Sequence, residues 1–120
     1  MKNLDHQKAE LLEAVHQLGY DSLRYSIFSK ERPGEWETVI EYDNSQGLYV
    51  VYATMDRASY NKKLTFETFQ EAKEKFLEKL RLDIQINRYY VEEGMPVNYD
   101  SPLWSKINTS KGEYTWHVVN

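Results

Sequence analysis

A strict alternation in residues 34–43 constrains the fold more than any other feature of the sequence. After Gly34, bulky or β-branched side chains occupy every second position from Trp36 to Tyr42, and the positions between and beside them are acidic with one exception, Val39. Because successive side chains of a β-strand point to opposite faces, this period predicts a strand with one buried face and one exposed face. The buried face is predicted to hold Trp36, Thr38, Ile40 and Tyr42.

The exposed face of this predicted strand is acidic. Positions 35 to 56 hold five acidic residues and no Lys or Arg, although the whole chain of 120 residues has a net charge of only −4. The acidity is therefore local. A net negative charge also argues against direct binding of nucleic acid, which needs a basic surface. The candidate partner-binding residues are Glu35, Glu37, Glu41 and Asp43 on this strand, and Asp56 with Arg57 after the next one.

Two neighbouring segments have the same strand-like character. They are Ser22–Lys30 and Leu48–Met55, and short connections rich in Pro, Gly, Asn and Ser join them to the acidic strand. Short connections predict an antiparallel meander of three strands. In the third strand, Tyr49 and Val51 are assigned to the outer face. The pair Asp56 and Arg57 either pins the loop that leaves this strand or is offered to a partner.

Two segments have the apolar spacing of amphipathic helices. The first is predicted over Asp5–Leu18, with Asp5 as N-cap and Gly19 as the stop. The second begins after Thr65 or after Thr68, either of which can cap it, and ends before Gly94. Its apolar stripe is Phe69, Ala72, Phe76, Leu80 and Ile84, with Phe66, Leu77 and Ile86 beside it.

The chain after Gly94 is predicted to be an irregular tail. Within it, Tyr99–Trp104 has a polar turn fixed by Pro102 and flanked by aromatic rings, which predicts a hook that docks the tail on the core. Tyr114–Val119 is a candidate short edge strand. A sheet with one apolar face needs cover, and two amphipathic helices supply it. The sequence therefore predicts a single α+β domain over residues 1–120.

Few residues point to catalysis or to a cofactor. The chain has no Cys, and its three His residues lie far apart, in no metal-ligand spacing. There is no Gly-rich phosphate loop, no apolar run long enough to span a membrane and no signal-peptide pattern, so we predict a cytoplasmic protein without catalytic residues, metal or cofactor. Two other interpretations stay open. The strand carboxylates are compatible with a metal-dependent hydrolase or nuclease, and the chain is also compatible with a small regulatory protein-binding module.

Five segments in order along the chain resemble a known family. They are Leu18–Arg24, Ser29–Glu37, Tyr52–Ser59, Glu71–Leu77 and Tyr99–Trp104. Together they resemble the Immunity protein 59 family over roughly residues 10 to 105. Proteins of this kind are encoded beside polymorphic toxins in Gram-positive bacteria.

The resemblance implies a non-enzymatic inhibitor that binds a cognate toxin domain in the cytoplasm of the producing cell. It provides no map of contact residues, so the site prediction rests on the acidic strand. A basic toxin, such as a nuclease domain, is the partner class that an acidic face favours. We predict a monomer or a weak homodimer, with no direct contact to nucleic acid or to a membrane.

Overall fold

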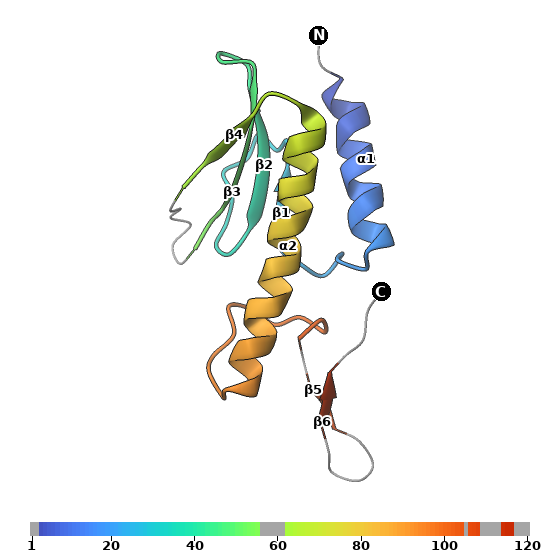
Figure 1. The fold of residues 1–120 in the computed structure, drawn as a ribbon, viewed down its shortest axis with the longest axis vertical. Helices are drawn as coiled ribbons and strands as arrows, with labels where there is room; N and C mark the ends of the chain where they lie inside the picture. The colour runs from blue at the N-terminus through green and yellow to red at the C-terminus, as the bar shows by residue number, and fades with distance from the viewer. Residues whose placement is uncertain (1–2, 56–61, 105, 109–113, 117–120) are drawn as a thin grey trace.

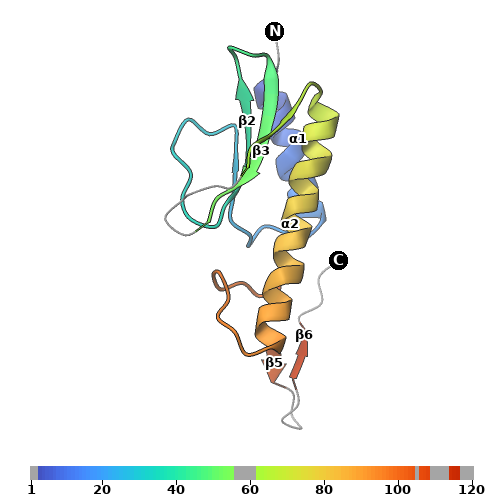
Figure 2. The same ribbon diagram turned by 60° about the vertical axis from the view of Figure 1, so that its left-hand side comes forward.

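A computed structural model describes the chain except for residues 1–2, 56–61, 105, 109–113 and 117–120. Two helices pack on the same face of a sheet, which gives the predicted α+β class in two layers (Figures 1 and 2). The helices are α1 (Leu4–Gln17) and α2 (Phe69–Glu92). The sheet consists of β1 (Tyr25–Ile27), β2 (Thr38–Asp43), β3 (Leu48–Ala53) and β4 (Leu64–Phe66), in the spatial order β1-β2-β3-β4.

The pairing of β1 differs from the predicted meander. β1 runs parallel to β2, with Tyr25 opposite Thr38 and Ile27 opposite Ile40. The β2–β3 and β3–β4 pairs are antiparallel. The antiparallel prediction is therefore confirmed for β2 and β3 and wrong for β1. The sequence pattern also does not predict β4, so the sheet is mixed and has one strand more than expected.

The loop of residues 28–37 is the reason for the parallel pairing. The strands predicted from the sequence are separated only by a tight turn. In the structure, β1 stops at Ile27 and β2 starts at Thr38, so the connection is longer. Phe28 and Trp36 have positive φ angles of 47° and 57°, a backbone conformation that bulky residues rarely adopt. These two bends bracket a loop that is long enough to carry the chain back to the start of the neighbouring strand.

Thr54, just after β3, fastens this loop. Its hydroxyl donates to the Gly34 carbonyl at 2.7 Å and accepts from the Glu37 backbone N–H at 2.8 Å. The Thr54 N–H also donates to the Glu37 carbonyl at 2.8 Å. The end of the loop is therefore held in register with β3 before β2 begins.

The core lies between the sheet and the helices. The inner face of the sheet contributes Ile40, Tyr49 and Val51, which pack with Leu11 of α1 and Phe76 of α2. The predicted buried face of the second strand is confirmed, because Thr38 and Ile40 are buried and Trp36 and Tyr42 pack partly buried around them. The assignment of Tyr49 and Val51 to the outer face is wrong. The β2–β3 register places them opposite Tyr42 and Ile40, on the side of the helices.

A second, smaller apolar cluster lies on the outer face of the sheet. It consists of Val39, Val50 and Tyr52, which are 1%, 9% and 4% exposed. Cross-strand pairing explains the cluster, since Val39 lies opposite Tyr52. The outer face is thus not purely acidic, and its centre is buried.

The ends of α1 show how short polar side chains and Gly delimit a helix. The N-cap is Asn3, whose side-chain oxygen accepts from the His6 N–H at 3.0 Å. The prediction of Asp5 as N-cap is therefore wrong, and Asp5 lies in the first turn. At the other end Gly19 has a φ of 74°, which confirms its predicted role as the stop.

The start of α2 is fixed by Thr68 rather than by Thr65, which lies in β4. The Thr68 hydroxyl accepts from the Glu71 N–H at 3.2 Å and donates to the Glu71 carboxylate at 2.9 Å. This is a variant of the capping box, in which the Thr68 hydroxyl bonds both the backbone N–H and the side chain of Glu71. The negative Glu71 also lies favourably in the first helical turn.

We expect Thr68→Ala to lower the free energy of unfolding by about 1 kcal/mol, because the Glu71 N–H loses its acceptor. Urea denaturation monitored by circular dichroism measures this change. The control is Thr65→Ala, which removes an exposed side chain from the alternative start and is expected to change stability by less than about 0.5 kcal/mol. Equal effects of both substitutions would contradict the assigned cap.

The Tyr99–Trp104 segment docks on α2 as the predicted hook. Trp104 is 1% exposed, and its indole N–H donates to the Tyr99 carbonyl at 2.9 Å. Arg88 of α2 donates to the Leu103 carbonyl at 2.9 Å, and Asn87 accepts from the Asn98 N–H at 2.9 Å. The hook thus covers the end of α2 that extends past the sheet (Figure 1).

The last described residues form a two-stranded hairpin of β5 (Lys106–Asn108) and β6 (Tyr114–Trp116). A strand does form within the predicted edge segment Tyr114–Val119, but it pairs with β5 and does not extend the main sheet. The end of that predicted segment lies outside the described residues.

Candidate partner-binding surface

In the structure, the acidic residues predicted for one face of the second strand lie near the two ends of β2. Val39, Glu41 and Asp43 alternate on the face opposite to that of Ile40 as predicted, but Val39 is buried, and Glu37 lies just before β2 beside a hollow that Lys8 of α1 also lines. Glu37 and Glu41 are four residues apart, which is roughly 13 Å along an extended strand. Because this distance exceeds the screening length of about 8 Å at physiological salt, the two carboxylates act as separate charges.

At one end, Glu41 and Asp43 border a hollow of about 340 Å³. Glu41 accepts a hydrogen bond from the Tyr52 hydroxyl at 3.0 Å. Lys63 lines the same hollow, and its ammonium lies 4.7 Å from the centre of the Tyr52 ring. This end therefore presents two carboxylates with a cation beside them, and not the purely negative surface that the sequence predicts.

Asp43 also has a structural role in the turn that follows β2. One of its carboxylate oxygens accepts from the Ser45 hydroxyl at 2.7 Å, from the Ser45 N–H at 2.9 Å and from the Gln46 N–H at 3.3 Å. These hydrogen bonds, led by that of the Ser45 hydroxyl, lower the pKa of Asp43. The carboxylate thus stays ionised and is engaged in the turn.

At the other end, Glu37 lies just outside β2 and is half-buried. Its side chain lies over Gly34, where an added Cβ would come within 3.1 Å of a Glu37 carboxylate oxygen. Glu37 borders a second hollow of about 320 Å³, together with Lys8 of α1 and Arg32 of the loop. Glu35 is exposed in the turn beside Trp36, and its carbonyl accepts from the Arg24 guanidinium at 3.4 Å.

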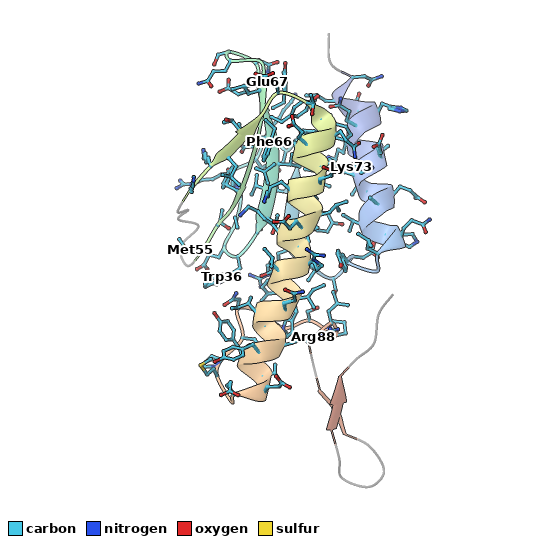
Figure 3. The ribbon with its side chains drawn as sticks, viewed as in Figure 1. Trp36, Met55, Phe66, Glu67, Lys73 and Arg88 are labelled. Atoms are coloured by element: carbon cyan, nitrogen blue, oxygen red, sulfur yellow. The ribbon has the colours of Figure 1, made fainter. Side chains whose placement is uncertain are left out.

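Three ion pairs among the described residues do not involve Glu37, Glu41 or Asp43. Lys73 of α2 pairs with Glu10 of α1 at 2.8 Å, and Lys75 pairs with Glu78 at 2.8 Å. Figure 3 shows Lys73 pointing from α2 toward α1. Neither these pairs nor the contact of His16 with Asp21 involves Glu37, Glu41 or Asp43. The predicted residues Asp56 and Arg57 lie outside the described part of the chain.

A groove that the sequence analysis does not identify lies between α2 and the ends of β2 and β3. Its volume is about 740 Å³. The sheet side is lined by Thr38 and Ala53, and the helix side is lined by the apolar side chains of Leu82, Ile86 and Tyr89. Figure 3 shows Trp36 and Met55 at this end of the sheet, where it faces the C-terminal half of α2.

The exposure of Ile86 corrects the sequence analysis, which places this residue beside the buried stripe. Ile86 is 43% exposed, and Tyr89, one turn further along the helix, is 52% exposed. The spacing of Leu82, Ile86 and Tyr89, four and then three residues, is the signal that indicates a second apolar face on this helix.

Asp83 lies on the same helix, where α2 meets the hook. Its carboxylate accepts from the Tyr99 hydroxyl at 2.9 Å, and the same hydroxyl accepts from the Arg24 N–H at 3.0 Å. Burial raises the pKa of Asp83, although the hydrogen bond from Tyr99 opposes the rise. Burial likewise raises the pKa of Tyr99. The three residues join α2, the segment before β1 and the hook through one buried hydroxyl.

The described residues contain no group of three or more His, Cys, Asp or Glu side chains that could hold a metal ion. Neither of the two described helices is long and apolar enough to cross a lipid bilayer.

Comparison with known proteins decides the family. The sequence profile described as Immunity protein 59 matches residues 4–105, which include α1, the four-stranded sheet, α2 and the hook. The chain belongs to the Immunity protein 59 family. The resemblance seen in the five sequence segments is thereby confirmed. No curated protein and no solved structure matches the chain significantly.

Every element of the main sheet and both long helices lie within the part of the chain that matches the family, whereas β5 and β6 lie after it. The outer-face carboxylates and the groove beside α2 also fall within it. The surfaces considered as binding sites are thus within the matched part of the chain, and β5 and β6 are outside it.

Proposed function

We propose that this member of the Immunity protein 59 family binds a cognate toxin domain in the cytoplasm of the producing cell. It blocks the toxin by covering the toxin's active surface. The observation that supports this proposal most directly is the state of Glu37 and Glu41. Neither side chain takes part in the ion pairs among the described residues, although Lys63 lines the hollow beside Glu41, and Lys8 and Arg32 line the hollow beside Glu37. Carboxylates outside ion pairs at a protein surface are suited to attract the positive charges of another protein.

A basic toxin domain is the partner that fits this charge pattern. An enzyme that attacks nucleic acid needs Lys and Arg side chains along its phosphate-binding groove. An acidic inhibitor is steered toward such a groove over long distances and can occupy the place of the phosphates. Inhibition by occupation needs no catalytic residue and no cofactor on the inhibitor. The net charge of −4 supports the same steering, and the five acidic residues of positions 35 to 56 account for all of it.

We expect the double variant Glu37→Lys/Glu41→Lys to associate with the toxin roughly tenfold more slowly than the wild-type protein at low salt, because both substitutions reverse the attraction. The difference should shrink as salt rises and the charges are screened. Stopped-flow mixing with the C-terminal domain of the toxin encoded beside this protein, from about 20 to 500 mM NaCl, measures both effects.

The matched control is Glu92→Lys/Glu93→Lys, which changes the net charge equally at the exposed end of α2. It should slow association much less, because those charges lie away from β2. Equal slowing by both pairs would mean that net charge alone steers the encounter. If the β2 variant associates as fast as the wild type at low salt, the acidic strand is not the contact surface.

A further inference from the structure

The outer edge of β1 presents backbone groups that the described fold does not pair. On its other edge β1 pairs with β2, where the Arg24 carbonyl accepts from β2 and the Phe28 N–H donates to β2. In a parallel pair only every second residue bonds to the neighbour, so Tyr25 and Ile27 direct their N–H and carbonyl groups to the outer edge. No backbone hydrogen bond between described residues uses these groups, because β1 is the last strand on its side of the sheet.

This edge lies between two walls. It borders the hollow of about 320 Å³ that Lys8 and Leu12 of α1 line on the helix side. The loop that follows β1 lines the other side through Ser29 and Pro33, and Figure 2 shows this loop on the side of the sheet away from the helices. We call this hollow the β1 slot. The open N–H and carbonyl groups thus face a slot and not the rim of the molecule.

The loop wall of the β1 slot is preorganised. Phe28 and Trp36 hold the two ends of the loop at positive φ, and both rings pack against the core. Thr54 fixes the later part of the loop through its hydrogen bonds to Gly34 and Glu37. Such backbone conformations persist only where the surrounding structure maintains them, and they cluster at functional sites. A partner that enters the slot therefore does not have to order this wall.

The geometry of the β1 slot selects one kind of occupant. Hydrogen-bonding groups spaced along a strand are complementary to the backbone of another extended segment. A second copy of this chain does not fit, because its own β1 edge lies equally deep between its own walls. The slot is lined by two basic and two acidic residues, which are Lys8, Arg32, Glu31 and Glu37. Charge therefore gives no preference, and the occupant is a single extended segment recognised through its backbone.

We propose that the β1 slot receives an extended segment of the toxin domain, which adds a strand to the sheet beside β1. The inference rests on the function proposed above, and Glu37 connects the two, because it belongs to the acidic surface and also lines the slot. The segment exchanges backbone hydrogen bonds with Tyr25 and Ile27. Every second side chain of the segment faces α1, where Leu12 is 40% exposed, so an apolar residue fits at that position.

Amide hydrogen exchange measured by NMR tests the pairing residue by residue. In the free protein, the N–H groups of Tyr25 and Ile27 should exchange faster than those of Ser26 and Phe28, which face β2. On addition of the C-terminal domain of the toxin encoded beside this protein, exchange at Tyr25 and Ile27 should slow at least about tenfold. Nuclear Overhauser effects between these two amides and toxin backbone protons should identify the added strand.

Leu12→Ala tests the helix wall of the β1 slot. It should weaken binding of the same toxin domain roughly tenfold, because an apolar side chain of the segment loses its contact. The matched control is Leu18→Ala, which truncates a leucine of similar exposure, 37%, outside the slot and should leave Kd unchanged. Isothermal titration calorimetry measures both affinities. Both leucines are exposed, so the unfolding midpoints should stay close to that of the wild type.

The outcomes separate this inference from the proposed function. If the toxin binds the wild type and exchange at Tyr25 and Ile27 does not change, no strand is added, and the proposed function stands without it. Slow exchange of both amides already in the free protein would mean that this chain or a second copy covers the edge, which also overturns the inference. Equal binding by Leu12→Ala and the wild type would contradict the placement of the segment against α1. If the wild type does not bind this toxin, the proposed function fails and strand addition fails with it.

Discussion

Trp104→Ala is expected to lower the free energy of unfolding by about 3–5 kcal/mol. The side chain is 1% exposed, and its ring meets the Tyr99 ring edge-on with 5.0 Å between centroids. Truncation leaves a cavity the size of an indole and removes the hydrogen-bond donor of the Tyr99 carbonyl. A loss of this size is a large share of the roughly 5–15 kcal/mol that stabilises a typical domain. Guanidinium denaturation followed by circular dichroism measures it.

A graded series separates packing from hydrogen bonding at this position. Trp104→Phe keeps a ring but removes the indole N–H, so it should cost less than Trp104→Ala while leaving the Tyr99 carbonyl without its donor. Met95→Ala changes an exposed side chain in the segment that leads to the hook and should cost less than about 0.5 kcal/mol. An unchanged midpoint for Trp104→Ala would show that the hook does not dock on α2 in solution.

The parts of this fold that follow from local periodicity could be predicted from the sequence. Leu11 and Val15 of α1 and the stripe Ala72, Phe76 and Leu80 of α2 are all buried as their spacing indicates. Pro102 and the aromatic residues around it likewise indicate the hook. These features depend on neighbours within a few residues, which one sequence contains.

The pairing of β1 could not be predicted in the same way. The decisive backbone angles belong to Phe28 and Trp36, and neither residue type signals a positive φ. Because the sequence does not reveal these two bends, Pro33 and Gly34 indicate a tight turn and an antiparallel hairpin. β4 was beyond reach for another reason, because three residues are too short to show a period.

Only part of the candidate site could be predicted from the sequence. Alternation correctly places Glu41 on the outer side, but it cannot show that Val39 is buried or that Lys63 lies beside Glu41. The groove depends on where the sheet ends relative to α2. The spacing of Leu82 and Ile86 indicates an apolar face, and only the three-dimensional structure shows that this face extends beyond its cover.

Tyr99→Phe is expected to destabilise the protein by about 1.5–3 kcal/mol at neutral pH, because it removes the hydrogen bond to the ionised Asp83 carboxylate. The Arg24 N–H also loses its acceptor.

The cost of Tyr99→Phe should depend on pH, and the sign follows from the raised pKa of Asp83. A carboxyl whose folded pKa lies above its unfolded value stabilises the fold fully below the unfolded pKa and loses this contribution as pH rises through the folded pKa. The Tyr99 hydroxyl limits that loss, because its hydrogen bond stabilises the ionised form of Asp83, which becomes populated as the pH rises through the folded pKa. Tyr99→Phe should therefore cost least near pH 3–4, around the ordinary Asp value of about 3.9, and most at pH 7.

Asp83→Asn provides the control for this pH dependence. The amide has no charge to lose, so in this background Tyr99→Phe should cost about 1 kcal/mol, the same at both pH values. Urea denaturation of the four proteins of this double-mutant cycle, at pH 4 and pH 7, gives the coupling between the two side chains. A coupling that does not change with pH would mean that Asp83 keeps one protonation state throughout.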